Sequence, residues 1–251
     1  MERRLYNIFI LKFQFLLLLI LIMKSNTNMI SGSNNDLNNT NNNNIIETGD
    51  LIFIQPDPNK YSELDDAILA TGRATISWMR NNGYNNVTNV VSSHVAIGWR
   101  DINNNNELSF IQALPNSGVI KTSEEDFFHS SNPSTTTYYH ASISNINMKQ
   151  YKQKAADIAL KQVGKPYADD FQAPPEYFYC SSLVDWAYQQ ASGRDEVFAP
   201  SNFTLIFVPE QWWTDYYASM TPPQILPQNV TGSNPTLVLH SPELSFKEYI
   251  P

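Results

Sequence analysis

The order of the predicted secondary-structure elements indicates an α+β fold rather than a doubly wound sheet. A short apolar strand comes first, one helix follows it, several β-branched segments come next, and two amphipathic helices come after these. In a chain of 251 residues, an apolar content of 42% with 12% aromatic residues is sufficient for the core of one domain. The sequence therefore predicts a single α+β domain in which helices pack against a sheet.

Residues 1–24 have the pattern of a secretory signal peptide. Arg3, Arg4 and Lys12 form a basic head, and an uninterrupted apolar run follows from Phe15 to Met23. This run is too short to span a bilayer comfortably, so we expect a secreted or endolysosomal protein. An uncleaved signal anchor is the alternative, because no clear cleavage site follows. In that case alone we expect contact with a membrane.

The Asn-rich stretch that follows predicts a disordered linker over residues 25–47. Residues 34–44 read NNDLNNTNNNN, which offers almost no apolar surface to offset the entropy of ordering. The folded domain is therefore expected over residues 48–251. Four N-x-[ST] sequons agree with secretion, but an Asn-rich chain supplies several by chance. They begin at Asn38, Asn86, Asn202 and Asn229.

The domain is predicted to open with a strand and a capped helix. Leu51 to Ile54 is a short apolar run that Pro56 ends. Ser62 is a suitable N-cap for a helix whose first turn holds Glu63, Asp65 and Asp66, acids that the helix dipole favours there.

A β-hairpin is predicted next. Val90–Trp99 and Leu108–Leu114 read as strands, and the polar run between them reads as a turn. If the hairpin is symmetric about Asn103, His94 lies opposite Gln112 on the same face. A slip of one residue would move Gln112 to the other face, so the pairing depends on the register.

The remaining elements are two strands, two helices and an aromatic tail. Strands are predicted over residues 119–120 and 138–143, and a helix over 148–163 that stops at Gly164. A second helix begins at Cys180 and ends before Gly193. The tail after Pro200 is rich in aromatic residues and proline, with one short helix starting at Pro209.

Several functions are excluded by composition. The nine glycines are too widely spaced for a nucleotide-binding loop or a nucleophile elbow. One cysteine and four histidines, without an HxH, HxxxH or HExxH pair, argue against a metal site, and we expect no cofactor. The net charge of −8 argues against nucleic acid as a partner.

Cys180 is the candidate nucleophile. It lies in the first turn of a predicted helix, where main-chain N–H groups and the dipole stabilise a thiolate and lower the pKa of the thiol. A lone cysteine on an apolar helix face is more often a small buried hydrophobe. A free thiol is nevertheless a liability in an oxidising compartment, so its retention in a secreted chain favours a function.

His94 and Gln112 supply the partners that a cysteine nucleophile needs. His94 would take the proton of the thiol, and the Gln112 amide would accept a hydrogen bond from the other ring nitrogen. A main-chain N–H at Cys180 would stabilise the oxyanion. The other three histidines are interpreted as structural, because no polar partner is adjacent to them. They are His129, His140 and His240.

Five segments in this order resemble the permuted NlpC/P60 (papain-like) cysteine hydrolases of the YiiX/YaeF type. They are GDLIFIQP at 49–56, SHVAIGW at 93–99, FIQALPNSGVIK at 110–121, GKPYADDF at 164–171 and YCSSLVDWAY at 179–188. The resemblance implies a circularly permuted papain-like fold, with the histidine strand before the nucleophile helix and an antiparallel sheet packed on helices. The aromatic tail resembles the C-terminal extension of that family.

The resemblance also implies site residues and an activity. Cys180 becomes the nucleophile, His94 the base, and Gln112 the third polar residue, a position where the family often has glutamate. Tyr167 falls on a tyrosine that lies beside the cysteine in related enzymes. The implied activity is hydrolysis of an amide or related acyl bond through an acyl-enzyme on Cys180, first of all a peptide amide such as those of bacterial cell walls.

Two alternatives stay open at this point. Other permuted members of the superfamily act on acyl lipids, and the aromatic tail could line a groove for an acyl chain. A non-catalytic binding module that retains the fold is the other, because Gln112 offers the imidazolium no full charge. The sequence leaves the oligomeric state open.

Overall fold

The computed structural model describes residues 45–57, 62–129, 135–172 and 174–251, which belong to one compact unit. The predicted signal peptide, most of the predicted linker and the Asn38 sequon lie outside these residues. Ile46, within the range predicted as linker, is buried against the sheet. No helix of the described segments is long and apolar enough to cross a membrane.

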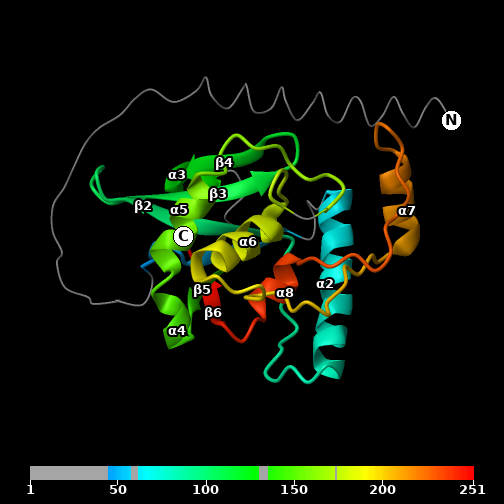
Figure 1. The fold of residues 1–251 in the computed structure, drawn as a ribbon, viewed down its shortest axis with the longest axis horizontal. Helices are drawn as coiled ribbons and strands as arrows, with labels where there is room; N and C mark the ends of the chain where they lie inside the picture. The colour runs from blue at the N-terminus through cyan, green and yellow to red at the C-terminus, as the bar shows by residue number, and fades with distance from the viewer. Residues whose placement is uncertain (1–44, 58–61, 130–134, 173) are drawn as a thin grey trace. The chain divides into compact units, whose positions relative to one another are not determined.

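A six-stranded antiparallel sheet forms the centre of the fold, in the order β4-β3-β2-β1-β5-β6 (Figure 1). The strands are β1 (Leu51–Gln55), β2 (His94–Asp101), β3 (Glu107–Leu114), β4 (Gly118–Ser123), β5 (Thr137–Ile143) and β6 (Leu244–Tyr249). β6 was not predicted. It comes from the end of the tail and pairs with β5, a strand about a hundred residues earlier, so no local signal reveals the pairing.

The β2–β3 hairpin differs in register from the symmetric prediction. Ile97 pairs with Ile111 and Asp101 with Glu107, so Gln112 lies two residues from the position opposite His94. The turn is a five-residue loop over 102–106, in which Asn105 and Asn106 adopt the left-handed conformation that asparagine tolerates. Because the shift is two residues, the alternation of faces is preserved.

Three helices follow β5 and form the main core with one face of the sheet. They are α4 (Ile146–Lys149), α5 (Lys152–Leu160) and α6 (Cys180–Ser192), and Figure 1 shows α5 and α6 across the strands. α6 begins and ends as predicted, with Gly193 in the left-handed conformation as its C-cap. The helix predicted over 148–163 is divided into α4 and α5, and Gly49 packs closely against Lys152, the first residue of α5.

A smaller aromatic core covers the other face of the sheet. Phe110 of β3 stacks on Phe127, and Phe128 packs edge-on to Tyr138 of β5. Phe127 and Phe128 belong to a short helix, α3 (Glu124–His129), that the sequence did not predict.

The longest helix among the described residues is α2 (Glu63–Asn81), whose N-cap is Ser62 as predicted, with reciprocal hydrogen bonds between Ser62 and Asp65. The tail contributes α7 (Glu210–Ala218), which starts one residue after the predicted start at Pro209. It also contributes α8 (Pro235–Leu239), which was not predicted and packs on α2. In Figure 1, α2 lies between the sheet and α7. The tail therefore packs against α2, which follows the first strand of the domain.

A buried polar cluster ties the start of β1 to β5 and α5. The Asp50 carboxylate contacts His140 Nε2 at 2.9 Å and Lys152 Nζ at 2.7 Å, and Glu47 contacts the same lysine. These partners hold the pKa of Asp50 below its usual value against the opposing effect of burial. The expectation that His140 has no polar partner is wrong, because Asp50 reaches it from 90 residues away in the sequence.

Candidate active site

Cys180 is the first residue of α6, where the helix starts from the extended residue Tyr179. Ser182 closes the first turn: its Oγ accepts from the Tyr179 N–H at 3.0 Å and donates to the Tyr179 carbonyl at 3.0 Å. The side chain of Cys180 is almost fully buried. The main-chain N–H groups at the start of α6, which have no partner within the helix, therefore lie near a thiol that is shielded from water.

His94 is the first residue of β2, and Gln112 of β3 holds its ring. His94 Nε2 lies 2.8 Å from Gln112 Oε1, and Gln112 Nε2 donates to Thr122 Oγ1 at 2.9 Å. With the amide oxygen accepting from Nε2–H, Nδ1 is the ring nitrogen left to act as a base. The structure thus brings His94 and Gln112 together, as a diagonal cross-strand pair rather than a directly opposed one.

Cys180 lies against the strand that carries His94. The main-chain N–H groups of Val95, the residue after the histidine, and of Ser181 and Cys180 itself act to lower the pKa of the thiol. Among the described residues the thiol makes no hydrogen bond to the imidazole. The two candidate groups are therefore linked through Val95, and no hydrogen bond joins them in the part of the chain that the structure describes.

Burial sets the protonation states of both groups. It raises the pKa of the Cys180 thiol to about 11, although the main-chain hydrogen bonds act in the opposite direction. Burial also lowers the pKa of His94, against the stabilising hydrogen bond of Gln112. The thiolate-stabilising effect expected of the helix N-terminus is therefore outweighed, and the resting pair is a neutral thiol and a neutral imidazole.

Asp65 is a charged neighbour of the site, although the sequence identified it only as an acidic residue in the first turn of a helix. Its carboxylate raises the pKa of both His94 and Cys180. It lies one turn before Ile68 on α2, and Ile68 lines a cavity together with Cys180. The first turn of α2 therefore borders the candidate site.

Tyr167 belongs to the same buried cluster as Cys180. It is buried and forms a parallel bridge with Phe178, two residues before Cys180. Burial raises the pKa of Tyr167 well above its usual value, and Cys180 contributes to that rise. The phenol is therefore neutral.

A small cavity of about 40 Å³ opens beside Cys180 and Ser181. The tail supplies much of its wall through Phe207 and Trp213, whose rings lie 5.3 Å apart between centroids. The Ser181 hydroxyl is fully buried and has no hydrogen-bond partner among the described residues. Sequence reasoning identified the aromatic tail as a possible groove lining but missed Ser181, for which periodicity gives no signal.

The residues described hold no cluster of three or more His, Cys, Asp or Glu side chains suited to a metal ion. The cysteine lies at a helix N-terminus that packs against an antiparallel sheet. The second strand of that sheet begins with a histidine whose ring is held by an amide. This is the arrangement of a papain-like cysteine hydrolase. Strand β2 precedes helix α6 in the chain, so the arrangement is the permuted form.

The sequence matches a family model over residues 45–246, and the chain belongs to that family, the permuted papain-like amidase enzymes, YaeF/YiiX, C92 family. The chain is accordingly an amidase of the cysteine peptidase class, and its fold is the permuted papain-like fold. The prediction of this family and fold is confirmed.

One solved structure, described as metalloprotein yiiX from Escherichia coli O157:H7, is similar in fold. The similarity covers 80% of this chain and 96% of that chain, with a TM-score of 0.54 and 21% sequence identity. At this identity the likeness supports the fold alone. No curated protein matches the sequence significantly.

Proposed function

We propose that Cys180 is the nucleophile of this amidase, that His94 is its base, and that Gln112 holds the histidine in the required tautomer. The observation that carries the proposal is the hydrogen bond between His94 Nε2 and Gln112 Oε1, made beside a strand whose next N–H reaches the Cys180 thiol. Nδ1 of His94 is then free to take the thiol proton.

Because the resting groups are neutral, proton transfer accompanies attack. The thiol proton moves to His94 Nδ1 as the sulfur bonds to the substrate carbonyl carbon, and negative charge develops on the carbonyl oxygen. Main-chain N–H groups at the start of α6 are placed to stabilise that oxygen. The imidazolium then protonates the leaving amine, and water, deprotonated by the same histidine, releases the acid and restores the thiol.

The pH dependence of Cys180 alkylation tests these roles without knowledge of the substrate. Burial alone predicts slow reaction until the pH approaches the raised thiol pKa of about 11. A base at His94 predicts a second, faster component with a midpoint below pH 7 that disappears in His94→Ala. Identical profiles for both proteins would instead support the non-catalytic binding module.

For the substrate, we propose two classes of amide. Peptide amides of bacterial cell walls are the first, because the resemblance to the wider superfamily implies them. Acyl lipids are the second, favoured by one observation: Ile68, Phe207 and Trp213 bring apolar side chains to the cavity beside Cys180.

A matched substrate panel separates the two classes. Short peptide amides and N-acyl amides of increasing chain length would be compared by kcat/KM, with Cys180→Ala as the blank. A lipid substrate predicts that kcat/KM rises with chain length and that Trp213→Ala removes the rise. A cell-wall substrate predicts turnover of muropeptides and no dependence on added methylene groups.

We also propose that the chain enters the secretory pathway through residues 1–24. The basic head and apolar run support this location. N-terminal sequencing of the mature protein is the test: cleavage before Asp50 would exclude the membrane-anchored alternative, and an intact Met1 would favour the anchor.

A further inference from the structure

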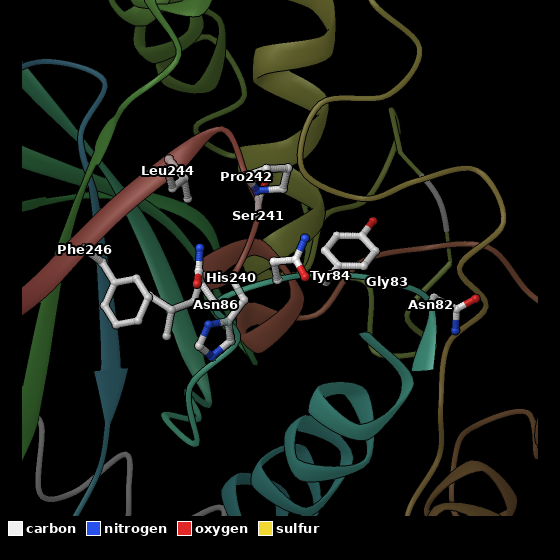
Figure 2. A pocket seen from close by; sticks show the side chains of 11 residues that line it. Asn82, Gly83, Tyr84, Asn86, His240, Ser241, Pro242, Leu244 and Phe246 are labelled. Atoms are coloured by element: carbon white, nitrogen blue, oxygen red, sulfur yellow. The ribbon is translucent and has the colours of Figure 1, made fainter. Parts of the chain in front are cut away.

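A second cavity, of about 580 Å³, lies between the loop that follows α2 and the segment that joins α8 to β6 (Figure 2). It shares no lining residue with the cavity beside Cys180. Its volume is within the range of about 300–1,000 Å³ that small-ligand pockets occupy. The amidase site makes no use of it.

The wall of this cavity combines aromatic rings with side-chain amides. Tyr84, His240 and Phe246 contribute rings, and the last two pack edge-on with centroids 5.4 Å apart. His240 Nε2 lies 2.9 Å from the Val90 carbonyl oxygen, which fixes the imidazole in place. A cavity of this composition suits a carbohydrate. Aromatic rings can pack on the apolar C–H faces of a sugar, and side-chain amides can exchange hydrogen bonds with its hydroxyl groups.

One of the amides that line the cavity can carry a carbohydrate covalently. Asn86 begins the sequon Asn86-Val87-Thr88, and its side chain is exposed. Figure 2 shows Asn86 with His240 between the rings of Phe246 and Tyr84. The other two described sequons provide a contrast. Asn202 and Asn229 are also exposed, but neither lines this cavity.

We propose that Asn86 is N-glycosylated and that the first sugar residues of its glycan lie in this cavity. In the modification, Asn86 Nδ2 forms a bond to the anomeric carbon of a lipid-pyrophosphate-linked oligosaccharide. The bond from that carbon to the pyrophosphate breaks, the lipid pyrophosphate leaves, and the amide nitrogen loses one proton. The proposal rests on passage through the secretory pathway and is independent of the amidase activity.

Because the glycan would be covalently attached to Asn86, weak contacts with the cavity wall are sufficient to hold its first sugar in place. A tethered sugar has an effective concentration in the millimolar range at the cavity, far above that of a free sugar. Tyr84 and Phe246 would then shield the first sugar from solvent and from enzymes. The structure therefore assigns the cavity to a part of the mature protein itself rather than to a diffusing ligand.

The test uses the full chain secreted from a eukaryotic host. Glycan release by an endoglycosidase would be followed at each sequon by peptide mass spectrometry, in native and in denatured protein. We expect Asn86 to be modified, and release from it to be about tenfold slower in the native protein than in the denatured protein. Unmodified Asn86, or equal rates in the two states, would overturn the proposal.

Two pairs of variants complete the test. Thr88→Val should remove the glycan while Thr88→Ser retains it, because the sequon needs the hydroxyl. Tyr84→Ala should raise the native release rate toward the denatured rate, whereas Tyr177→Ala, an exposed tyrosine outside the cavity, should leave it unchanged. If the Asn86 glycan of the Tyr84→Ala protein were released as slowly as that of the natural protein, the placement of the glycan in this cavity would be contradicted. The alkylation profile of Cys180 should be the same in all four, which separates this proposal from the proposed catalytic roles.

Discussion

At the scale of single residues, the candidate site is defined by a competition between burial and hydrogen bonding. Cys180 has main-chain N–H donors that favour a thiolate, yet its burial raises the thiol pKa. His94 has Gln112 as an acceptor, yet burial lowers its pKa. The amide of Gln112 fixes the tautomer without adding charge, so the proposed mechanism requires proton transfer during attack rather than a preformed ion pair.

Replacing Gln112 with glutamate should supply the missing charge. Gln112→Glu keeps an oxygen beside His94 Nε2, and Thr122 Oγ1 can donate to the second oxygen. Each unit by which the carboxylate raises the pKa of His94 corresponds to about 1.4 kcal/mol. We expect Cys180 alkylation at pH 6–7 to become about tenfold faster in this variant.

Gln112→Leu is the matched control for this change, because it removes the acceptor at similar volume. It should slow alkylation relative to the natural protein. Equal rates for the glutamate and leucine variants would contradict the pairing of His94 with position 112.

Asp185 of α6 predicts a pH dependence of stability. Burial raises its pKa from 3.8 to about 6, although its carboxylate accepts the Phe198 N–H at 2.9 Å. Since the folded-state pKa is the higher one, its contribution is fully present below about pH 4 and is lost as the pH rises through about 6. The loss amounts to at most about 3 kcal/mol.

Asp185→Asn removes the titrating group and keeps an oxygen for Phe198. Its free energy of unfolding, from urea titrations at several pH values, should fall less between pH 4 and 7 than that of the natural protein. If the free energy of unfolding changed with pH in the same way in Asp185→Asn and in the natural protein, Asp185 would not titrate in this range.

At the scale of elements, close backbone approaches position the site. Gly118 opens β4 with a φ of +72°, and an added Cβ would overlap the Lys165 carbonyl. That carbonyl accepts the Val119 N–H at 2.8 Å and precedes the segment holding Tyr167. The edge of the sheet and the segment that leads to Tyr167 are thus joined through a position that only glycine fits.

Gly118→Ala should destabilise the protein by about 2 to 4 kcal/mol, because strain at positive φ is added to a backbone clash. Gly83→Ala is the matched control, since Gly83 also has a positive φ, +82°, but open space around it. It should cost about 1 kcal/mol. Thermal unfolding of both variants provides the comparison, and equal losses would exclude the clash as the cause.

At the scale of the whole molecule, the C-terminal tail completes the domain. It supplies α8 against α2, β6 at the edge of the sheet, and the aromatic wall of the cavity at Cys180. Trp213 is buried and packs against Phe171 and Phe207. The tail therefore both stabilises the fold and keeps water from the thiol.

Trp213→Ala should expose Cys180 as well as destabilise the domain. Truncating a buried tryptophan costs about 3 to 5 kcal/mol, and a more hydrated thiol should titrate nearer the ordinary value of about 8.5. Alkylation of the folded variant at pH 8.5 should therefore be faster than in the natural protein. Trp212→Ala, which removes a neighbouring ring outside the cavity wall, should leave the rate unchanged.

The sequence by itself determined the local elements and the chemical identity of the candidate site. Ser62 and Gly193 mark helix ends because capping is a local property, and the start of a helix at Cys180 was readable from its apolar face. His94 and Gln112 were readable as one face of a hairpin, even with the register wrong by two residues, because an even shift preserves alternation.

The tertiary structure alone decided the contacts between distant segments. Three features join residues that are far apart in the chain: the pairing of β6 with β5, the contact of Asp50 with His140, and the cavity that Cys180 and Trp213 both line. Local propensity contains no information on such contacts, and the pKa of a thiol depends on how completely those contacts remove water from it. A candidate nucleophile could therefore be named from the sequence, whereas the protonation state of its thiol could be obtained only from the fold.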